Sequence, residues 1–312
     1  MSLLNLPAAV DIREVGPRDG LQIEATITTE AKFTLLRALA RTGAARIEAT
    51  AFVSPTAVPS MADAEQVAAF VLDVPGVDWS ALVASPSGAR RAVAAGIRTV
   101  EYVVSAADGH SWANVRRSSE EALAAVEEVA TIVHDTGGRL EVIIATAWDC
   151  PFDGPTPSSR TVSVARRALD LGADQLCLGD TIGTTSPRRV VGLIDAVRDA
   201  CPGVDLGAHF HNTRGVGIAN ALAAMQTGVT QLDASVGGMG GCPFAPGASG
   251  NIATEELLYL LDDAGVQTGL DADAVLSAAI LAQELVGHDL DSHLLRAGGR
   301  SQPRKLSSAE PG

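Results

Sequence analysis

Strand-like and helix-like segments alternate along this chain of 312 residues, and the alternation predicts an α/β fold: a single (β/α)8 TIM barrel with extra C-terminal helices. About eight short β-prone runs are separated by Ala/Leu-rich segments with helical spacing. Alternation at this spacing implies right-handed βαβ units and a parallel sheet. About eight such units in roughly 250 residues fit closure into a barrel.

The β-prone runs follow one another at regular intervals. We expect strands at residues 10–15, 46–49, 79–83, 100–104, 140–144, 175–178, 206–210 and 231–234. We expect helices between them, among others at 29–42, 118–136, 159–171, 187–200 and 216–227. Several helical segments end in a glycine just before the next strand, where a positive φ is favoured: Gly43, Gly96, Gly137, Gly172 and Gly228.

A doubly wound sheet is the competing fold. It is disfavoured because no G-x-G-x-x-G motif follows the first strand, and because polar residues cluster at the ends of several strands rather than at one switch point. No linker divides the chain, so we expect one domain over residues 8–295, with a further helix at 271–284 on the outside of the barrel. Residues 296–312 are polar and predict a disordered tail.

Composition narrows the range of partners. The chain has 37 acidic and 23 basic residues, a net charge of −14, and 46% hydrophobic residues, enough for a sizeable core. This charge argues against binding to nucleic acid or to an anionic membrane. No apolar stretch is long enough for a membrane span, so we expect a cytoplasmic protein. The four cysteines form no C-x-x-C pair and are expected to be free thiols.

Polar residues stand where several of the expected strands end. In a TIM barrel the active site is built from the C-terminal ends of the strands and the loops that follow. The segment after the first strand places Arg18, Asp19 and Gln22 at this mouth. The second strand carries Glu48, and the sixth ends at Asp180.

The seventh strand ends in a His-x-His pattern. Residues two apart on a strand face the same way, so His209 and His211 are expected to point toward one ion together with the Asp19 carboxylate. A lone histidine is more often a hydrogen-bonded imidazole, but this pair at a strand end favours a divalent cation. The share of oxygen ligands decides between Zn and the harder Mg or Mn.

A glycine-rich segment, residues 236–251, follows the eighth strand. So many glycines are typical of a mobile loop that closes over a substrate, and Cys242 lies within it. A thiol on such a loop can act as a general acid or base. The alternative is that the glycines form a phosphate-cradling turn and that Cys242 has no part in the chemistry.

Three motifs, at residues 11–22, 47–55 and 240–245, closely resemble the 3-hydroxy-3-methylglutaryl-CoA (HMG-CoA) lyases of the DRE-TIM metallolyase superfamily. The resemblance covers roughly residues 8 to 295 and implies an acyl-CoA substrate and a homodimer. It implies a divalent Mg or Mn held by Asp19, His209, His211 and Asn251. It further implies catalytic roles for Arg18, Glu48, Asp180, His209 and Cys242, substrate contacts from Arg18 and Gln22, and a structural role for Glu255.

The sequence departs from the lyases in places. Asn212 and Arg214 follow the histidines where the lyases usually have Asp and Tyr, which is closer to the related synthases. Near the expected CoA site, residues 112–113 replace a basic pair. Arg116 and Arg117 compensate for that loss or simply form a solvated helix start.

The sequence therefore predicts a metal-dependent carbon–carbon lyase. Its expected reaction is cleavage of HMG-CoA, or a related 3-hydroxy-3-alkylglutaryl-CoA, to acetyl-CoA and acetoacetate or the matching 3-oxo acid. The alternatives are another DRE-TIM aldolase, lyase or acyl-CoA condensing enzyme that acts on a different 3-hydroxy acid, and a metal-binding barrel without catalysis. The Gly-Gly-Cys-Pro segment favours the lyases over the synthases.

Overall fold

Eight parallel strands close into a barrel in the computed structural model, which describes residues 5–241 and 250–299. The strands pair in the order β1-β10-β9-β8-β5-β4-β3-β2, and β1 pairs with β2 to complete the ring. Their bounds are β1 (Asp11–Glu14), β2 (Arg46–Phe52), β3 (Asp78–Val83), β4 (Thr99–Ser105), β5 (Arg139–Ala145), β8 (Gln175–Asp180), β9 (Leu206–Phe210) and β10 (Gln231–Ala234). The predicted TIM barrel is confirmed.

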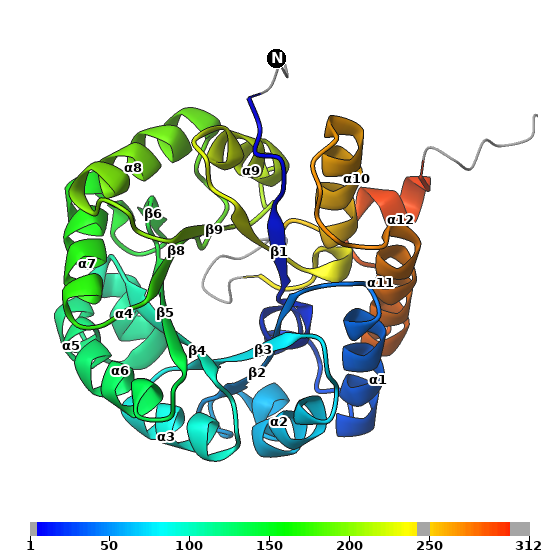
Figure 1. Cartoon of the computed structure of the whole chain (residues 1–312), viewed down its shortest axis with the longest axis horizontal. Coiled ribbons are helices and arrows are strands. Elements are labelled where there is room, and N and C mark those ends of the chain that lie inside the picture. Colours follow the sequence, from blue (N-terminus) through cyan, green and yellow to red (C-terminus); the bar gives the residue numbers. More distant parts are fainter. Residues whose placement is uncertain (1–4, 242–249, 300–312) are drawn as a thin grey trace, which may run out of the picture.

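Helices surround the strands, as Figure 1 shows in a view down the barrel. The first nine helices are α1 (Thr29–Ala40), α2 (Ala64–Leu72), α3 (Pro86–Ala94), α4 (Asp108–Val115), α5 (Ser119–Ala124), α6 (Val126–His134), α7 (Ser158–Asp170), α8 (Pro187–Ala200) and α9 (Gly217–Gln226). Short elements in the connecting loops are the helical turns η1 (Gly16–Gly20), η2 (Pro59–Met61) and η3 (Val236–Gly238), and the hairpin of β6 (Asp149–Cys150) and β7 (Gly154–Pro155).

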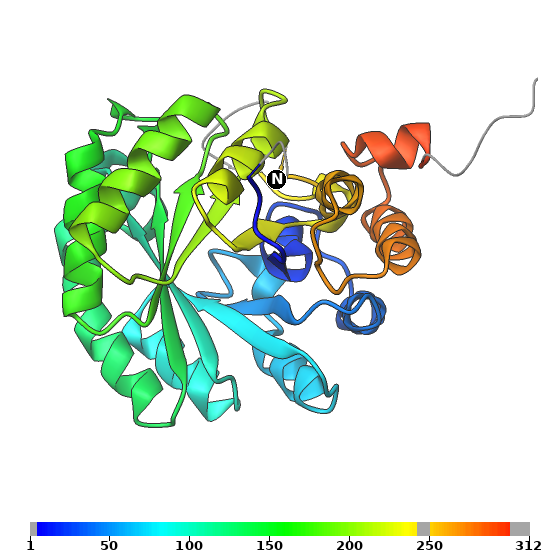
Figure 2. The ribbon, with the colours of Figure 1, turned by 45° about the horizontal axis from the view of Figure 1, so that its top comes forward.

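Three helices follow the eighth strand: α10 (Thr254–Ala264), α11 (Ala272–Val286) and α12 (His293–Ala297). They lie together on one side of the barrel, next to α1, in both Figure 1 and Figure 2. The helix expected at 271–284 is α11, which packs against α1 on the outside as predicted. The expected domain boundary at residue 295 falls inside α12, and residues 300–312 of the expected tail lie outside the described residues.

Local sequence signals set several helix ends. The side chains of Thr28, Ser85 and Asp271 each accept a hydrogen bond from a backbone N–H in the first turn of the helix that follows. Ser118 and Glu121 form a reciprocal capping box at the start of α5. The five glycines expected at helix C-termini all have positive φ, between 70° at Gly137 and 102° at Gly172.

One expected helix is divided. The segment 118–136 was expected to be a single helix, but it consists of α5 and α6, which meet at Ala125. Tyr102 on β4 donates a hydrogen bond of 2.9 Å from its hydroxyl to the carbonyl oxygen of Ala122. In an uninterrupted helix this carbonyl would accept a hydrogen bond from the N–H of Val126. The tyrosine hydroxyl therefore donates to a backbone carbonyl oxygen in the turn before the residue at which the two helices meet.

No helix among residues 5–241 and 250–299 is long and apolar enough to cross a membrane.

Gly88 allows the start of α3 to approach the end of β2. A Cβ atom at this position would lie 2.4 Å from the carbonyl oxygen of Phe52, whereas a Cβ at the exposed helical Gly192 would have no neighbour within 4 Å. We expect Gly88→Ala to lower the free energy of unfolding by about 1–3 kcal/mol. The control Gly192→Ala should raise it by about 0.5–1 kcal/mol. Urea denaturation measures both, and a Gly88→Ala protein as stable as the parent would contradict the close approach.

Candidate active site

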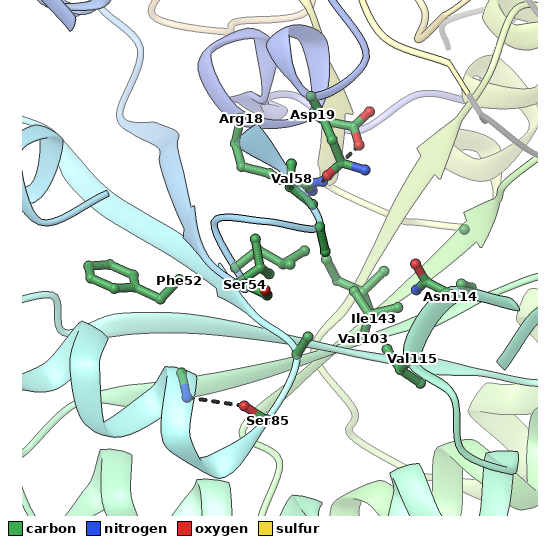
Figure 3. Close-up of a pocket in the computed structure, with 18 of the residues that line it drawn as sticks. Arg18, Asp19, Phe52, Ser54, Val58, Ser85, Val103, Asn114, Val115 and Ile143 are labelled. Atoms are coloured by element: carbon green, nitrogen blue, oxygen red, sulfur yellow. Dashed lines mark hydrogen bonds and ion pairs between the residues drawn. The ribbon is translucent and has the colours of Figure 1, made fainter. Parts of the chain in front are cut away.

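A cavity of about 540 Å³ opens at the C-terminal ends of the barrel strands. Figure 3 shows Arg18 and Asp19 on one side of it, with Asn114, Val115, Val103 and Ile143 across from them. Its apolar lining consists largely of Phe52, Val53, Val58, Leu82, Val103, Val115 and Ile143. Its polar lining includes Arg18, Asp19, Gln22, Ser54, Ser85, Arg91, His110, Asn114, Arg117, Thr181, His209 and His211.

The tight turn η1 presents Arg18 and Asp19 to the cavity. The carbonyl oxygen of Val15 lies 2.8 Å from the N–H of Asp19 and also accepts from two neighbouring N–H groups, which closes the turn. Nη1 of Arg18 donates to Oδ1 of Asp19 at 2.8 Å and reaches Oε1 of Gln22 at 3.5 Å. All three residues that the sequence placed at the mouth after the first strand therefore line the cavity.

Asp19, His209 and His211 form the cluster that the His-x-His pattern predicted. One ligand atom from each lies within 4.8 Å of the others. Asn251 joins them: its backbone pairs with that of His211, and its side-chain Nδ2 donates to Oδ2 of Asp19 at 2.7 Å. The four residues that the resemblance implied as metal ligands are thus adjacent, although they come from three separate parts of the chain.

The chemistry of this cluster fits a divalent cation. Among the described residues, Nδ1 of His211 and Oδ1 of Asn251 are buried and have no hydrogen-bond partner. Burial lowers the pKa of His211 to about 4, with a further contribution from His209, so its imidazole is neutral as a ligand must be. Burial opposes ionisation of Asp19, but neighbouring Arg18 holds the pKa of that carboxyl below its usual range. Two imidazoles, a carboxylate and an amide oxygen form a donor set that suits a divalent cation.

Asp233 on β10 orients one of the histidines. Nδ1 of His209 lies 3.0 Å from Oδ2 of Asp233, and Oδ1 of the same aspartate accepts from Nε of Arg13 at 2.8 Å. Burial disfavours the ionised form of Asp233, but Arg13 and His209 together hold the pKa of this carboxyl group below its usual range. The carboxylate fixes the ring so that Nε2 is free to face the cluster. Sequence reasoning missed Asp233, whose only signal was its place inside a strand.

Glu48 and Asp180 lie behind the cavity surface rather than in its lining. Glu48 is fully buried, and its Oε1 lies 2.6 Å from Nε of Arg18. Asp180 accepts hydrogen bonds from the N–H groups of Thr184 and Thr185, at 3.0 and 3.3 Å, and so fixes the loop that leads into α8. Burial raises the pKa of Asp180 to about 6. Glu48 therefore contacts a residue that lines the cavity, whereas Asp180 holds a loop whose first residue, Thr181, lines it.

Two further carboxylates hold the loop that follows β10. Glu14 accepts from the N–H groups of Gly16 and Val236, at 2.8 and 3.0 Å, and from the hydroxyl of Thr254 at 2.6 Å. Glu255 accepts from the N–H of Gly237 at 3.1 Å, in keeping with the structural role that the resemblance implied. Cys242, the expected lid cysteine, lies outside the described residues.

Two arginines on the cavity wall come from separate parts of the chain. Arg117 follows α4 and lines the cavity, in line with one of the two sequence interpretations. Arg91 on α3 was not anticipated; its Nε donates to Oε1 of Glu65 at 2.8 Å. Nearby, His110 lies 2.6 Å from the hydroxyl of Ser105, and burial lowers its pKa to about 4, so it is neutral.

Comparison with known proteins identifies the family. The HMGL-like family model matches residues 9–281. The chain belongs to the HMGL-like family. It is 37% identical to a hydroxymethylglutaryl-CoA lyase of Bacillus subtilis, covering 93% of this chain and 97% of the relative. It is 38% identical to an (R)-citramalyl-CoA lyase of Chloroflexus aurantiacus, covering 93% and 95%.

A solved structure extends the comparison to the fold. An HMG-CoA lyase from Acinetobacter baumannii, in complex with coenzyme A and 3-methylmalate, superimposes with a TM-score of 0.92 at 35% identity. The match covers 98% of this chain and 100% of that chain. The likeness to carbon–carbon lyases therefore extends over almost the entire barrel.

Glu14 makes stability depend on pH. Burial raises its pKa from 4.5 to about 7, so the folded protein binds a proton that the unfolded chain releases. The parent should lose stability relative to Glu14→Gln as the pH rises from about 4.5 through 7, because a raised carboxyl pKa favours folding only while the group is protonated. The difference is of the order of 3 kcal/mol when Glu14 is fully ionised. Urea denaturation of both proteins at several pH values measures it; parallel stability curves would contradict this assignment.

Proposed function

We propose that this member of the HMGL-like family cleaves HMG-CoA to acetyl-CoA and acetoacetate in a divalent-metal-dependent reaction. The observation that carries the proposal is the cluster of Asp19, His209, His211 and Asn251 beside Arg18, within a cavity of about 540 Å³. The near full-length similarity to HMG-CoA lyases supports the same reaction class.

The reaction needs no oxidant, reductant or second substrate. The C3 hydroxyl of the substrate loses its proton, the C3–O bond becomes a carbonyl, and the C2–C3 bond breaks. Its electron pair leaves on C2 as the enolate of acetyl-CoA, which is then protonated at carbon. A protein that promotes this cleavage must accept one proton, stabilise negative charge on the thioester oxygen, and return a proton to C2.

The residues of the cavity supply these functions. Asp19, His209, His211 and Asn251 would hold the cation, which when bound lowers the pKa of a coordinated alcohol. Arg18 is permanently charged and placed to stabilise the developing enolate oxygen. His209, held by Asp233, is the alternative to Cys242 as the proton donor to C2. Cys242 is the candidate donor to C2, and Gln22 is a candidate substrate contact next to Arg18.

Cleavage of (R)-citramalyl-CoA is the second candidate, because a relative of that name is as similar as the HMG-CoA lyases. Both substrates are 3-hydroxyacyl thioesters, and the same bond cleavage gives acetyl-CoA with acetoacetate from one and pyruvate from the other. The expected homodimer and cytoplasmic location stay predictions.

A product assay tests the proposal. Purified protein is incubated with HMG-CoA, (R)-citramalyl-CoA and the corresponding free acids in the presence of Mg or Mn, and acetyl-CoA, acetoacetate and pyruvate are quantified. We expect acetyl-CoA and acetoacetate in equal amounts from HMG-CoA. Release of pyruvate at a much higher kcat/KM would assign the second candidate instead, and no cleavage of any thioester would overturn both.

Removal of the metal should abolish activity, and added Mg or Mn should restore it, because the alcohol proton is otherwise held too tightly. Independently of activity, His211→Ala should weaken Mn binding by at least about tenfold, as followed by electron paramagnetic resonance. His134→Ala is the matched control, since that histidine is exposed and pairs with Asp174 at the surface. Unchanged Mn affinity in His211→Ala would remove His211 from the ligand set.

Cys242→Ser should bind metal and substrate but lose about 10²- to 10⁴-fold in kcat, the usual contribution of one acid–base group. Cys201→Ser, at the end of α8, is the control and should leave kcat unchanged. Steady-state kinetics on the best substrate separate the two. If kcat of Cys242→Ser matched the parent, the thiol would have no part in the proton transfer.

A further inference from the structure

Two fully buried glutamates meet inside the barrel beneath Arg18. Glu48 lies on β2 and Glu101 on β4, and the strand between them, β3, presents the small Ser80 next to Glu48. Side chains from alternate strands of such a barrel share one layer of its interior. The two carboxyl groups are accordingly within hydrogen-bonding distance of each other.

The available N–H donors do not satisfy two ionised carboxylates. Nη1 of Arg13 donates to Oε1 of Glu101 at 2.7 Å, and Nε of Arg18 lies 2.6 Å from Oε1 of Glu48. The Oε2 atoms of both glutamates are buried, and no N–H group among the described residues donates to them. Two negative charges in contact at a buried site repel strongly, whereas a single shared proton satisfies an oxygen on each side.

We propose that Glu48 and Glu101 share one proton that resides on Glu48, and that Glu101 is a positioning residue that keeps Glu48 neutral beside Arg18. The link to catalysis rests on the proposed function, in which Arg18 stabilises the enolate. The shared proton itself does not depend on that function.

The surroundings decide which glutamate holds the proton. Burial raises the pKa of Glu48 well above its usual range, and Arg18 only partly opposes this. Burial acts on Glu101 as well, but Arg13 holds the pKa of Glu101 below its usual range. The other groups that face the pair are Ser80 on β3, which lowers the pKa of Glu101, and Glu141 on β5, which shares Arg13 with Glu101.

The protonation state of Glu48 determines the net charge of the Arg18–Glu48 pair at the cavity wall. With Glu48 neutral, Asp19 is the only carboxylate among the described residues that pairs with Arg18, and Asp19 also belongs to the metal cluster. If Glu48 were ionised, it would neutralise the guanidinium from behind. The attraction between Arg18 and negative charge that develops on the thioester oxygen would then be weaker.

Infrared spectroscopy of the protein without substrate tests the shared proton. Difference spectra at neutral pH between the parent and Glu48→Gln should show loss of the carbonyl band of one protonated carboxylic acid. The parent minus Glu101→Gln spectrum should show the same band. Glu101 is itself ionised, so the band can be lost only because the amide introduced by Glu101→Gln donates to Glu48 and lets it ionise. A parent that lacks the band, or a Glu101→Gln protein that retains it, overturns the proposal.

The pH dependence of kcat tests the effect on Arg18. Activity of the parent should fall as Glu48 ionises at high pH, and in Glu101→Gln this fall should move down by about 1–3 pH units with KM nearly unchanged. Glu141→Gln is the matched control, because it also removes a carboxylate from Arg13 but does not contact Glu48. The same shift in Glu141→Gln would overturn the specific role of Glu101. If Glu101→Gln does not fold, the Glu48→Gln infrared spectrum still decides whether the pair holds a proton. Inactivity of every variant and the parent would count against the proposed function alone.

Discussion

The buried guanidinium of Arg13 is the interaction on which the arrangement of the site depends. It donates to carboxylates on three other strands: Asp233 on β10, Glu101 on β4 and Glu141 on β5. Removing charged groups from water costs several kcal/mol each, and this geometry offsets part of the cost because the guanidinium donates to all three carboxyl groups. Through Asp233 the network reaches His209, and through Glu101 it reaches Glu48 and Arg18. The candidate metal cluster and Arg18 are therefore held by the same interior cation.

A neighbouring guanidinium lowers the pKa of some buried carboxyl groups of the barrel, but it does not outweigh burial at Glu48 and Glu141, whose pKa values are raised although Arg18 and Arg13 contact them. Asp19, Asp233 and Glu101 contact a guanidinium, and each has a pKa below its usual range despite full burial. Glu14 and Asp180 contact only backbone and hydroxyl donors, and burial raises the pKa of these groups to about 7 and about 6. The barrel thus favours the ionised form of Asp19, Asp233 and Glu101, and shifts the titration of the carboxyl groups that fix loops toward neutral pH.

The sequence predicted those parts of the site that follow from local spacing. The barrel followed from alternation of elements, and the convergence of His209 and His211 followed from their spacing of two on a strand. Arg13 and Glu101 were not anticipated, because they are 88 residues apart and meet only after the barrel closes. A charged residue inside a short strand gives no local sign of its partner. The position of Glu14 at the end of the first strand was visible in the sequence. Its partner Val236, in the loop that follows β10, lies far along the chain and could not be inferred.

The lining of the cavity bears on which substrate is cleaved. Arg18 and Asp19 lie on one side, and Val103, Ile143 and the polar Asn114 lie across from them (Figure 3). HMG-CoA and citramalyl-CoA present the same 3-hydroxyacyl thioester, so groups that bind this part discriminate little between them. The two substrates differ by one methylene in the arm that carries the free carboxylate. A methylene in an apolar pocket is worth about 1–3 kcal/mol, so the selectivity must come from the fit of that arm to the cavity wall.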